Sequence, residues 1–248
     1  EEAGRKLRYD AFYDEARQIA EKLAAEHGGS PDDFSEHIRI AVAHNADDQA
    51  ETILFRVLRG TGTDGLAGIA YERKERGFSV IRPILDIPRK EIEEYCREHD
   101  LSPVEDHTNH QSIYTRNKIR LELLPELEKE YNENVRGALL RLGKIAASDS
   151  DYLQQCAEEA LQEFLRETSS DEVVLERDGL AGIHEALRHR ILLQSFARLG
   201  LASDISAERI AAADRIIEKK QAPKTVEFPR GYRVTVAGGL VHICAPIK

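Results

Sequence analysis

In the first 115 residues, short apolar segments rich in β-branched side chains alternate with longer amphipathic segments. The run IRIAVA at 38–43 predicts a buried strand, and apolar residues at helical spacing predict a helix at 47–59 directly after it. The other elements expected here are a helix at 5–27, a strand at 78–83, a helix at 87–101 and a short strand or loop entry at PVED, 103–106. Strands that alternate with helices indicate an α/β domain with a largely parallel sheet.

From about Tyr114 the pattern changes to long helical segments. RNKIRLELLPELEKEY predicts a helix that breaks at Pro125, and helical spacing returns at 133–167, 184–199 and 207–219. Four short strands are expected at EVVLE, KTVEF, YRVTV and LVHIC, and the pair GG between the last two is a hairpin signal. The sequence therefore predicts an α/β domain at 1–115 and a mainly helical domain with a small antiparallel sheet at 116–248.

Charge and cysteine usage exclude several classes of protein. The net charge of −10 argues against non-specific nucleic-acid binding, although not against a local basic patch. No apolar run approaches the ~18 residues of a membrane span. Cys96, Cys156 and Cys244 are far apart and form no CxxC pair, so neither a disulfide framework nor a zinc site is expected. This cysteine usage predicts a cytoplasmic protein.

Three carboxylates, Asp47, Asp48 and Glu51, lie where the strand predicted at 38–43 passes into a helix. Negative charge at a helix start is stabilising by ~0.3–1 kcal/mol and Asn45 is a good N-cap, so a purely structural role would explain them. However, ligands of open α/β sheets bind beyond the carboxyl ends of the strands. Residues three apart project from one helix face, and such a carboxylate pair can hold an ammonium group or a magnesium ion. The cluster alone leaves both interpretations open.

Four segments in chain order resemble one known family. They are EEAGRKLRYDAF (1–12), AVAHNADDQAETILFRVLRGTGTDGL (41–66), IRPILDIPRKEI (81–92) and VEDHTNHQSIYTRNKIRLELLPEL (104–127). Together they resemble the tRNA(Ile)-lysidine synthetases, which are PP-loop ATP pyrophosphatases. The helical part and FPRGYRVTVAGGLVHI (228–243) are similar to the second domain of that family. The resemblance therefore covers essentially the whole chain.

The resemblance implies a Rossmann-like PP-loop ATPase domain followed by a helical, tRNA-facing domain. Family members use ATP and Mg²⁺ to adenylate the C2 carbonyl oxygen of the wobble cytidine in tRNA(Ile) with a CAU anticodon. The ε-amine of free L-lysine then displaces AMP to give lysidine. By position, Asp48 and Glu51 match the essential acidic pair that orients lysine, and Arg116 matches an essential arginine suited to developing negative charge. Members are often dimers, so a homodimer is a further expectation.

The expected substrate-binding residues are Arg8, His44, Asp47 and Arg59. Arg8, in RKLRY, matches a family position near the substrate. Arg59 opens the glycine-rich stretch RGTGTDGL, 59–66, which the resemblance makes an active-site or tRNA-facing loop. His44 is expected mainly to form hydrogen bonds at the helix entry.

The chain also carries basic residues whose role the sequence leaves open. Arg116, Lys118 and Arg120 form a small basic cluster, which is either a solvated helix face or part of the site. Arg136, with Arg141 and Lys144, could extend a stripe for the tRNA backbone, although ordinary surface charge explains these residues better.

Two features depart from the family pattern. His44-Asn45 stands where many members carry His-His, and the nucleotide-binding loop SGGxDS does not occur in the chain. The residues that bind the nucleotide phosphates are therefore unknown, and we expect an incomplete PP-loop domain, truncated at its N-terminus, that is inactive alone and lacks the far C-terminal domain. Two alternatives remain: another PP-loop tRNA-modifying enzyme such as a thiolase, and a non-catalytic tRNA-binding fragment.

Overall fold

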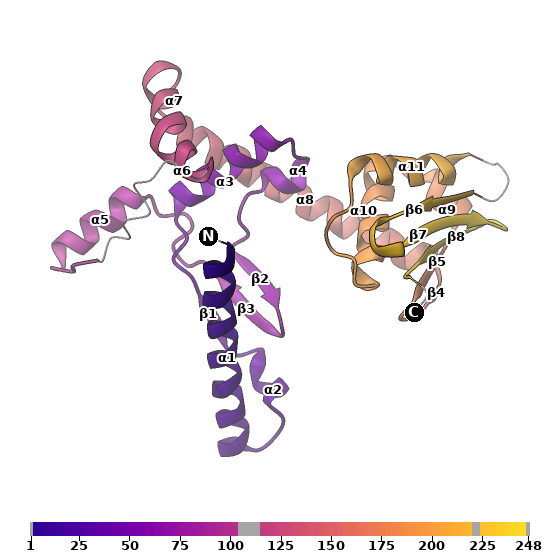
Figure 1. The fold of residues 1–248 in the computed structure, drawn as a ribbon, viewed down its shortest axis with the longest axis horizontal. Helices are drawn as coiled ribbons and strands as arrows, with labels where there is room; N and C mark the ends of the chain where they lie inside the picture. Colours follow the sequence, from indigo (N-terminus) through magenta and orange to yellow (C-terminus); the bar gives the residue numbers. More distant parts are fainter. Residues whose placement is uncertain (1, 104–114, 220–223, 247–248) are drawn as a thin grey trace. The chain divides into compact units, whose positions relative to one another are not determined.

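The computed structural model describes residues 2–103, 115–219 and 224–246. It divides into two compact units, Glu1–Ala147 and Ser148–Lys248, drawn in Figure 1. The expected division near residue 115 into a nucleotide-binding and a tRNA-facing domain stays a prediction. Most of PVED lies outside the described residues. Within the described ranges, no helix has the length and apolar character needed to cross a membrane.

The first unit combines helices with a small sheet. Its elements are α1 (Glu2–His27), α2 (Pro31–Ser35), β1 (Arg39–Ala41), α3 (Ala46–Arg59), α4 (Thr63–Leu66), β2 (Glu72–Glu75), β3 (Phe78–Ile81), α5 (Arg89–Glu98), α6 (Thr115–Lys118), the π-helix η2 (Ile119–Leu123), α7 (Leu124–Glu130) and the start of α8 (Val135–Phe164). The strands and helices predicted at 38–43, 47–59 and 78–83 are confirmed with slightly different ends. The unit therefore has the mixed α/β character that the sequence predicts.

The three described strands of this unit form a sheet in the order β1-β3-β2. β1 pairs with β3 in parallel, whereas β2 pairs with β3 as an antiparallel hairpin. The hairpin turns at Arg76 and Gly77, which have φ of 53° and 86°, as a tight hairpin turn requires. The predicted parallel pairing is confirmed for β1 and β3. The described sheet also contains the antiparallel strand β2, which the sequence did not predict because ERKE lacks the apolar alternation that marks a strand.

Helix α1 packs on this sheet. Its Tyr13 and Ala16 form a buried cluster with Ile40 of β1 and with Phe78 and Val80 of β3. Tyr9, Phe12, Tyr13 and Ala16 recur every three or four residues, so one face of this part of α1 meets the strands. Pairing within the sheet fixes the end of β1, and α3 begins five residues after it.

A second apolar cluster joins α3 to the segment that follows α6. Leu54 of α3 packs against Ile119 and Leu124, which lie at the start of η2 and of α7. The predicted break at Pro125 takes the form of a π-helical turn, in which the Leu124 N–H donates to the Ile119 carbonyl. Proline has no N–H to give the carbonyl four residues earlier, and the wider turn accommodates this loss. The break therefore leaves one nearly continuous helical segment packed along α3.

The second unit is a five-stranded antiparallel sheet packed against helices. Its elements are the end of α8, β4 (Leu165–Thr168), β5 (Glu172–Glu176), α9 (Arg177–Gly182), α10 (Glu185–Arg198), α11 (Ala207–Glu218), β6 (Lys224–Glu227), the 3₁₀ turn η3 (Pro229–Gly231), β7 (Arg233–Ala237) and β8 (Leu240–Cys244). The strand order is β4-β5-β8-β7-β6. The four predicted strands and the hairpin at Gly238-Gly239 are confirmed. The helix predicted at 133–167 ends earlier, at Phe164, because Leu165–Thr168 pair with β5.

The core of this unit lies between the sheet and its helices. Alternate residues of β7 and β8, such as Val234 and Ile243, point into it and meet Phe196 of α10 and Ile217 of α11. A buried ion pair connects α10 to α11. Arg188 of α10 donates from Nε to Oδ1 of Asp214 at 2.5 Å and from Nη2 to Oδ2 at 3.0 Å, and both residues are buried.

Candidate active site

The acidic motif forms the capped start of α3. Asn45 is the N-cap: its Oδ1 accepts from the Asp48 N–H, and Asp48 Oδ2 accepts from the Asn45 N–H, each at 3.1 Å. This reciprocal capping box satisfies two backbone donors that would otherwise lack partners. Oδ2 of Asp48 therefore has the helix-capping role that the structural interpretation predicts. Oδ1 takes no part in the cap.

That other oxygen joins an ion-pair cluster with two arginines. Asp48 Oδ1 accepts from Nη2 of Arg116 at 3.2 Å and from Nη2 of Arg120 at 3.0 Å. Glu51 accepts from Arg116 Nε at 3.2 Å and from Nε and Nη2 of Arg120 at 2.6 and 2.9 Å. Two carboxylates one helical turn apart thus bind two guanidinium groups from the segment that packs on α3.

Glu51 is the buried centre of this cluster. Its side chain has no exposed surface, whereas that of Asp48 is 17% exposed. A buried carboxylate is stable only when it is paired and hydrogen-bonded, and both arginines meet this need. Burial by itself lowers the pKa of Arg120, but the hydrogen bond to Glu51 and the charges of Glu51, Asp48 and Asp47 raise it above its ordinary value. The two carboxylates and the two guanidinium groups therefore stabilise one another in their charged forms.

Asp47 is bound to neighbouring elements. Its Oδ2 accepts from the Arg89 N–H at the start of α5 at 2.8 Å, and its Oδ1 accepts from Arg136 of α8, also at 2.8 Å. Arg136 also donates to Glu128. Both oxygens of Asp47 are therefore occupied in fixing the elements around the start of α3.

The glycine-rich segment after α3 is fastened to that helix by two side chains. Gln49 donates to the carbonyls of Ala67 and Ile69 and accepts from the Ile69 N–H. Arg56 donates from Nη1 to the carbonyls of Gly65 and Gly68 at 2.9 and 2.6 Å. Burial lowers the pKa of this guanidinium from its ordinary value. The segment is thus held in one conformation against α3.

Gly68 is required by this arrangement. Its φ is +71°, and a Cβ atom there would lie 2.5 Å from Oε1 of Gln49. We expect Gly68→Ala to lower the free energy of unfolding by about 1–3 kcal/mol, because it combines a left-handed backbone with a clash against the Gln49 amide. Urea denaturation followed by circular dichroism measures this. Gly62→Ala is the matched control, since a Cβ there meets nothing within 4 Å. Equal losses in the two variants would contradict this interpretation of the loop.

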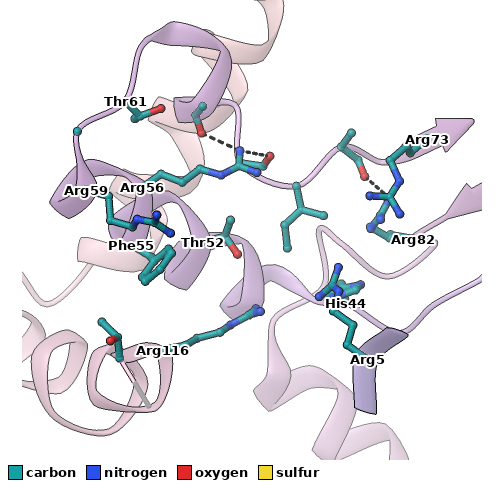
Figure 2. Close-up of a pocket in the computed structure, with 16 residues that line it drawn as sticks. Arg5, His44, Thr52, Phe55, Arg56, Arg59, Thr61, Arg73, Arg82 and Arg116 are labelled. Carbon is teal, nitrogen blue, oxygen red and sulfur yellow. Dashed lines mark hydrogen bonds between the residues drawn. The ribbon is translucent and has the colours of Figure 1, made fainter. Parts of the chain in front are cut away.

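A cavity of about 900 Å³ opens between α3, the glycine-rich segment and the ends of β2 and β3. Figure 2 shows the arginine side chains that surround it, together with His44, Thr52 and Phe55. The arginines that line it are Arg5, Arg56, Arg59, Arg73, Arg82 and Arg116. Burial lowers the pKa of His44, and the charges of Arg82, Arg116 and Arg5 lower it further against the opposing effect of Asp48. The imidazole is therefore neutral at pH 7, and the cavity owes its positive charge to arginine.

Comparison with known proteins identifies the family to which the part of the chain that contains this site belongs. Residues 1–127, slightly more than half of the chain, match the family described as the PP-loop domain. The chain belongs to the PP-loop family. The match extends from α1 into the first half of α7, so the carboxylate–arginine cluster and the cavity both lie within the PP-loop domain.

Several relatives of this PP-loop protein are named tRNA(Ile)-lysidine synthase. That of Clostridioides difficile strain 630 is 37% identical over 231 residues, which are 93% of this chain and 46% of the relative. That of Clostridium acetobutylicum is 36% identical over 250 residues, 100% of this chain and 49% of the relative. That of Thermosynechococcus vestitus is 30% identical over 247 residues, 100% and 66% respectively. The chain spans about half the length of the first two relatives.

The PP-loop structure brings most of the sequence-predicted residues to one region. Asp48, Glu51 and Arg116 are in direct contact. His44 and Arg59 line the cavity that Arg116 also lines. Arg8 is exposed and does not line the cavity, whereas Arg5, one turn earlier in α1, does. A substrate-binding role for Arg8 stays a prediction, but the geometry favours Arg5 because it shares the cavity with the other arginines.

Several residues of this PP-loop site were not assigned a role from sequence. Arg120 appeared only as a member of a basic cluster, although it makes the most contacts to Glu51. Its spacing of four residues from Arg116 places both on one helix face, which was the available signal. Arg82 and Gln49 act through contacts with residues 12 to 20 positions away. No local pattern marks contacts at that separation.

Proposed function

We propose that the protein joins L-lysine to C2 of the wobble cytidine in a tRNA(Ile) with a CAU anticodon, using ATP. The observation that carries this proposal is the contact of Arg116 with Asp48 and Glu51 at the edge of an arginine-lined cavity in a PP-loop domain. Relatives named tRNA(Ile)-lysidine synthase support the same chemistry, since they are similar over nearly the whole chain.

The proposed reaction has two steps. The C2 oxygen of the cytidine attacks the α-phosphorus of ATP, and diphosphate leaves. The ε-amine of lysine then attacks C2, the C2–O bond breaks, AMP leaves with that oxygen, and the amine loses its proton to give lysidine. Both steps move negative charge over phosphate oxygens, so fixed cations at those oxygens lower the barrier.

The contacts favour different roles for the three residues. Arg116 lines the cavity and also contacts both acids, so we assign it to the phosphate oxygens of the adenylation step. Glu51 is wholly buried, and its assigned role is to position Arg116 and Arg120 rather than to touch substrate. Asp48 keeps an exposed fraction of 17% and is assigned to the ammonium group of lysine, which would take the place of one arginine N–H group at Oδ1. From the sequence, both acids were expected to orient lysine; in this proposal only Asp48 does so.

The carboxylates do not fit a magnesium ion held by the protein. Asp47 is occupied by Arg136, and Asp48 and Glu51 are occupied by Arg116 and Arg120. Mg²⁺ requires near-octahedral oxygen ligands at ~2.0–2.1 Å, which these paired oxygens do not offer. Across the described part of the chain, no group of three or more potential ligands is arranged for a metal. The proposed steps therefore involve no magnesium ion bound by these residues.

A lysine-incorporation assay tests the proposal. The protein translated from its complete coding sequence is incubated with ATP, isotopically labelled L-lysine and a tRNA(Ile) transcript that carries CAU. We expect label in the tRNA and one AMP released for each lysine incorporated. A transcript with uridine in place of the wobble cytidine is the control and should stay unlabelled. Transfer of sulfur from a sulfur donor, without lysine incorporation, would instead identify a thiolase.

A further inference from the structure

The arginines that line the cavity are only partly neutralised by the described part of the chain: Arg116 pairs with Asp48 and Glu51, and Arg73 pairs with Glu75. Of the sixteen described residues that line it, six are arginines and none is aspartate or glutamate. This contrasts with the chain as a whole, which carries a net charge of −10. Like charges gathered in a partly enclosed space repel one another, and a bound anion relieves this repulsion.

Arg82 is the clearest case. Its side chain is buried, with 3% of its surface exposed. Its Nη1 donates to the Ala70 carbonyl at 2.7 Å, and its buried Nε has no hydrogen-bond partner among the described residues. Within the described ranges it forms no ion pair with a carboxylate. A buried guanidinium that lacks an opposite charge is destabilising, so its presence at the wall of a cavity indicates an anionic ligand.

Arg5 and Arg59 place two further charges at this cavity. Arg5 lies over the ring of Tyr9 with its Cζ 5.3 Å from the ring centre, and Arg59 lies over Phe55 at 5.2 Å. Figure 2 shows Arg59 beside Phe55. Stacking on a ring fixes the guanidinium plane but leaves its N–H groups unused. Neither arginine forms an ion pair among the residues that the structure describes, so both have donors available to a ligand.

His44 adds an uncharged polar group at the same wall. Its Nδ1 is buried and has no hydrogen-bond partner in the part of the chain that the structure describes. A neutral imidazole with the proton on Nδ1 donates a hydrogen bond to an oxyanion. The volume of about 900 Å³ matches sites for ligands larger than a single inorganic ion.

We propose that this cavity is a phosphate-binding site, in which Arg5, Arg59 and Arg82 hold the phosphate groups of a substrate. Guanidinium groups bind phosphate oxygens with paired, charge-assisted hydrogen bonds, which makes phosphate the anion that this set of donors recognises best. Two substrates of the proposed function carry such groups, ATP and the tRNA backbone. Which of them supplies the phosphate rests on the proposed function, whereas phosphate binding itself does not.

Binding measurements on exposed-arginine variants test this inference. Tripolyphosphate and ATP are titrated by calorimetry, and a fluorescent RNA hairpin with the CAU anticodon loop by anisotropy. The variant is Arg5→Ala/Arg59→Ala. The control is Arg17→Ala/Arg97→Ala, which removes the same charge from exposed arginines outside the cavity. Because the variant removes charge-assisted hydrogen bonds to phosphate, we expect it to bind tripolyphosphate at least about tenfold more weakly than the control variant.

The remaining ligands identify the source of the phosphate. Weaker binding of ATP with unchanged RNA binding assigns the cavity to the nucleotide. Weaker RNA binding with a smaller dependence on salt, and unchanged ATP binding, assigns it to the tRNA backbone. Equal affinities of the cavity and control variants for all three ligands would overturn the inference. Lysine incorporation is read separately, so a protein that binds phosphate here without transferring lysine would refute only the proposed function.

Arg82→Met provides an independent readout. In the absence of ligand we expect this variant to be no less stable than the unaltered protein, because it removes an unpaired buried charge. We also expect tripolyphosphate to raise the melting temperature of the unaltered protein and not that of the variant. A variant that melts at a lower temperature and still responds to tripolyphosphate would show that Arg82 has only a structural role.

Discussion

Glu51→Gln is expected to lower the free energy of unfolding by about 3 kcal/mol and to reduce lysine transfer by about 100-fold or more. The carboxylate is fully buried and holds both Arg116 and Arg120. The amide keeps the shape of the side chain but removes its charge, so the two guanidinium groups retain only Asp48 as a counter-charge. Urea denaturation gives the first quantity and labelled-lysine incorporation the second.

Glu158→Gln is the matched control for this prediction. Glu158 also pairs with an arginine, Arg198, but the two side chains are 48% and 31% exposed. Exposed ion pairs contribute ~0–1 kcal/mol, so this variant should retain its stability and its activity. If Glu51→Gln proved as mild as Glu158→Gln, then Glu51 would not be the centre of the cluster.

The second large effect is expected in the other compact unit. Asp214→Asn should lower the free energy of unfolding by about 3–5 kcal/mol, because it leaves the buried Arg188 without its bidentate carboxylate. Arg188 would retain Glu218, whose side chain is 53% exposed and therefore a weaker partner. Urea denaturation monitored at the tyrosines or by circular dichroism checks this.

Asp178→Asn serves as its control. Asp178 pairs with Arg177 at 3.0 Å, but its side chain is 68% exposed. Arg177 also donates to the carbonyls of Ile217 and Glu218 at the end of α11, which the substitution leaves in place. We expect a loss below about 1 kcal/mol. Similar losses for Asp178→Asn and Asp214→Asn would show that burial does not govern the strength of these pairs.

The elements that the sequence predicted well share a strong local pattern. β5 and β8, EVVLE and LVHIC, are rich in β-branched residues, and α3 and α10 have apolar residues at helical spacing. β2 and β4 were missed because ERKE and LRET have no apolar alternation. They become strands through backbone pairing with β3 and β5. That pairing depends on the folded sheet and not on the propensity of the segment.

The site was predictable to a similar extent. The acids of α3 and Arg116 stood in recognisable motifs, and the structure brings them together. The sequence did not reveal that Glu51 would be enclosed by Arg116 and Arg120, since these contacts join residues 65 and 69 positions apart. It also did not reveal that Arg5, Arg59 and Arg82 would meet at one cavity. These residues come together only when segments far apart in the sequence pack against each other, so no local pattern reveals their contacts.

The central claim is that the start of α3 contributes directly to lysine transfer, and Asp48→Asn tests it most directly. The asparagine oxygen still accepts from the Asn45 N–H, so the cap of α3 survives. Loss of the charge that faces Arg116 and Arg120 should lower the free energy of unfolding by about 1–3 kcal/mol, which leaves the protein folded. The protein translated from its complete coding sequence is assayed for incorporation of labelled lysine into tRNA(Ile) with a CAU anticodon. We expect kcat/KM for lysine to fall by about 100-fold or more, because a neutral amide lacks the negative charge that binds the ammonium group. Near-normal incorporation by a stably folded Asp48→Asn variant would contradict the account and leave the acidic motif as a helix cap alone.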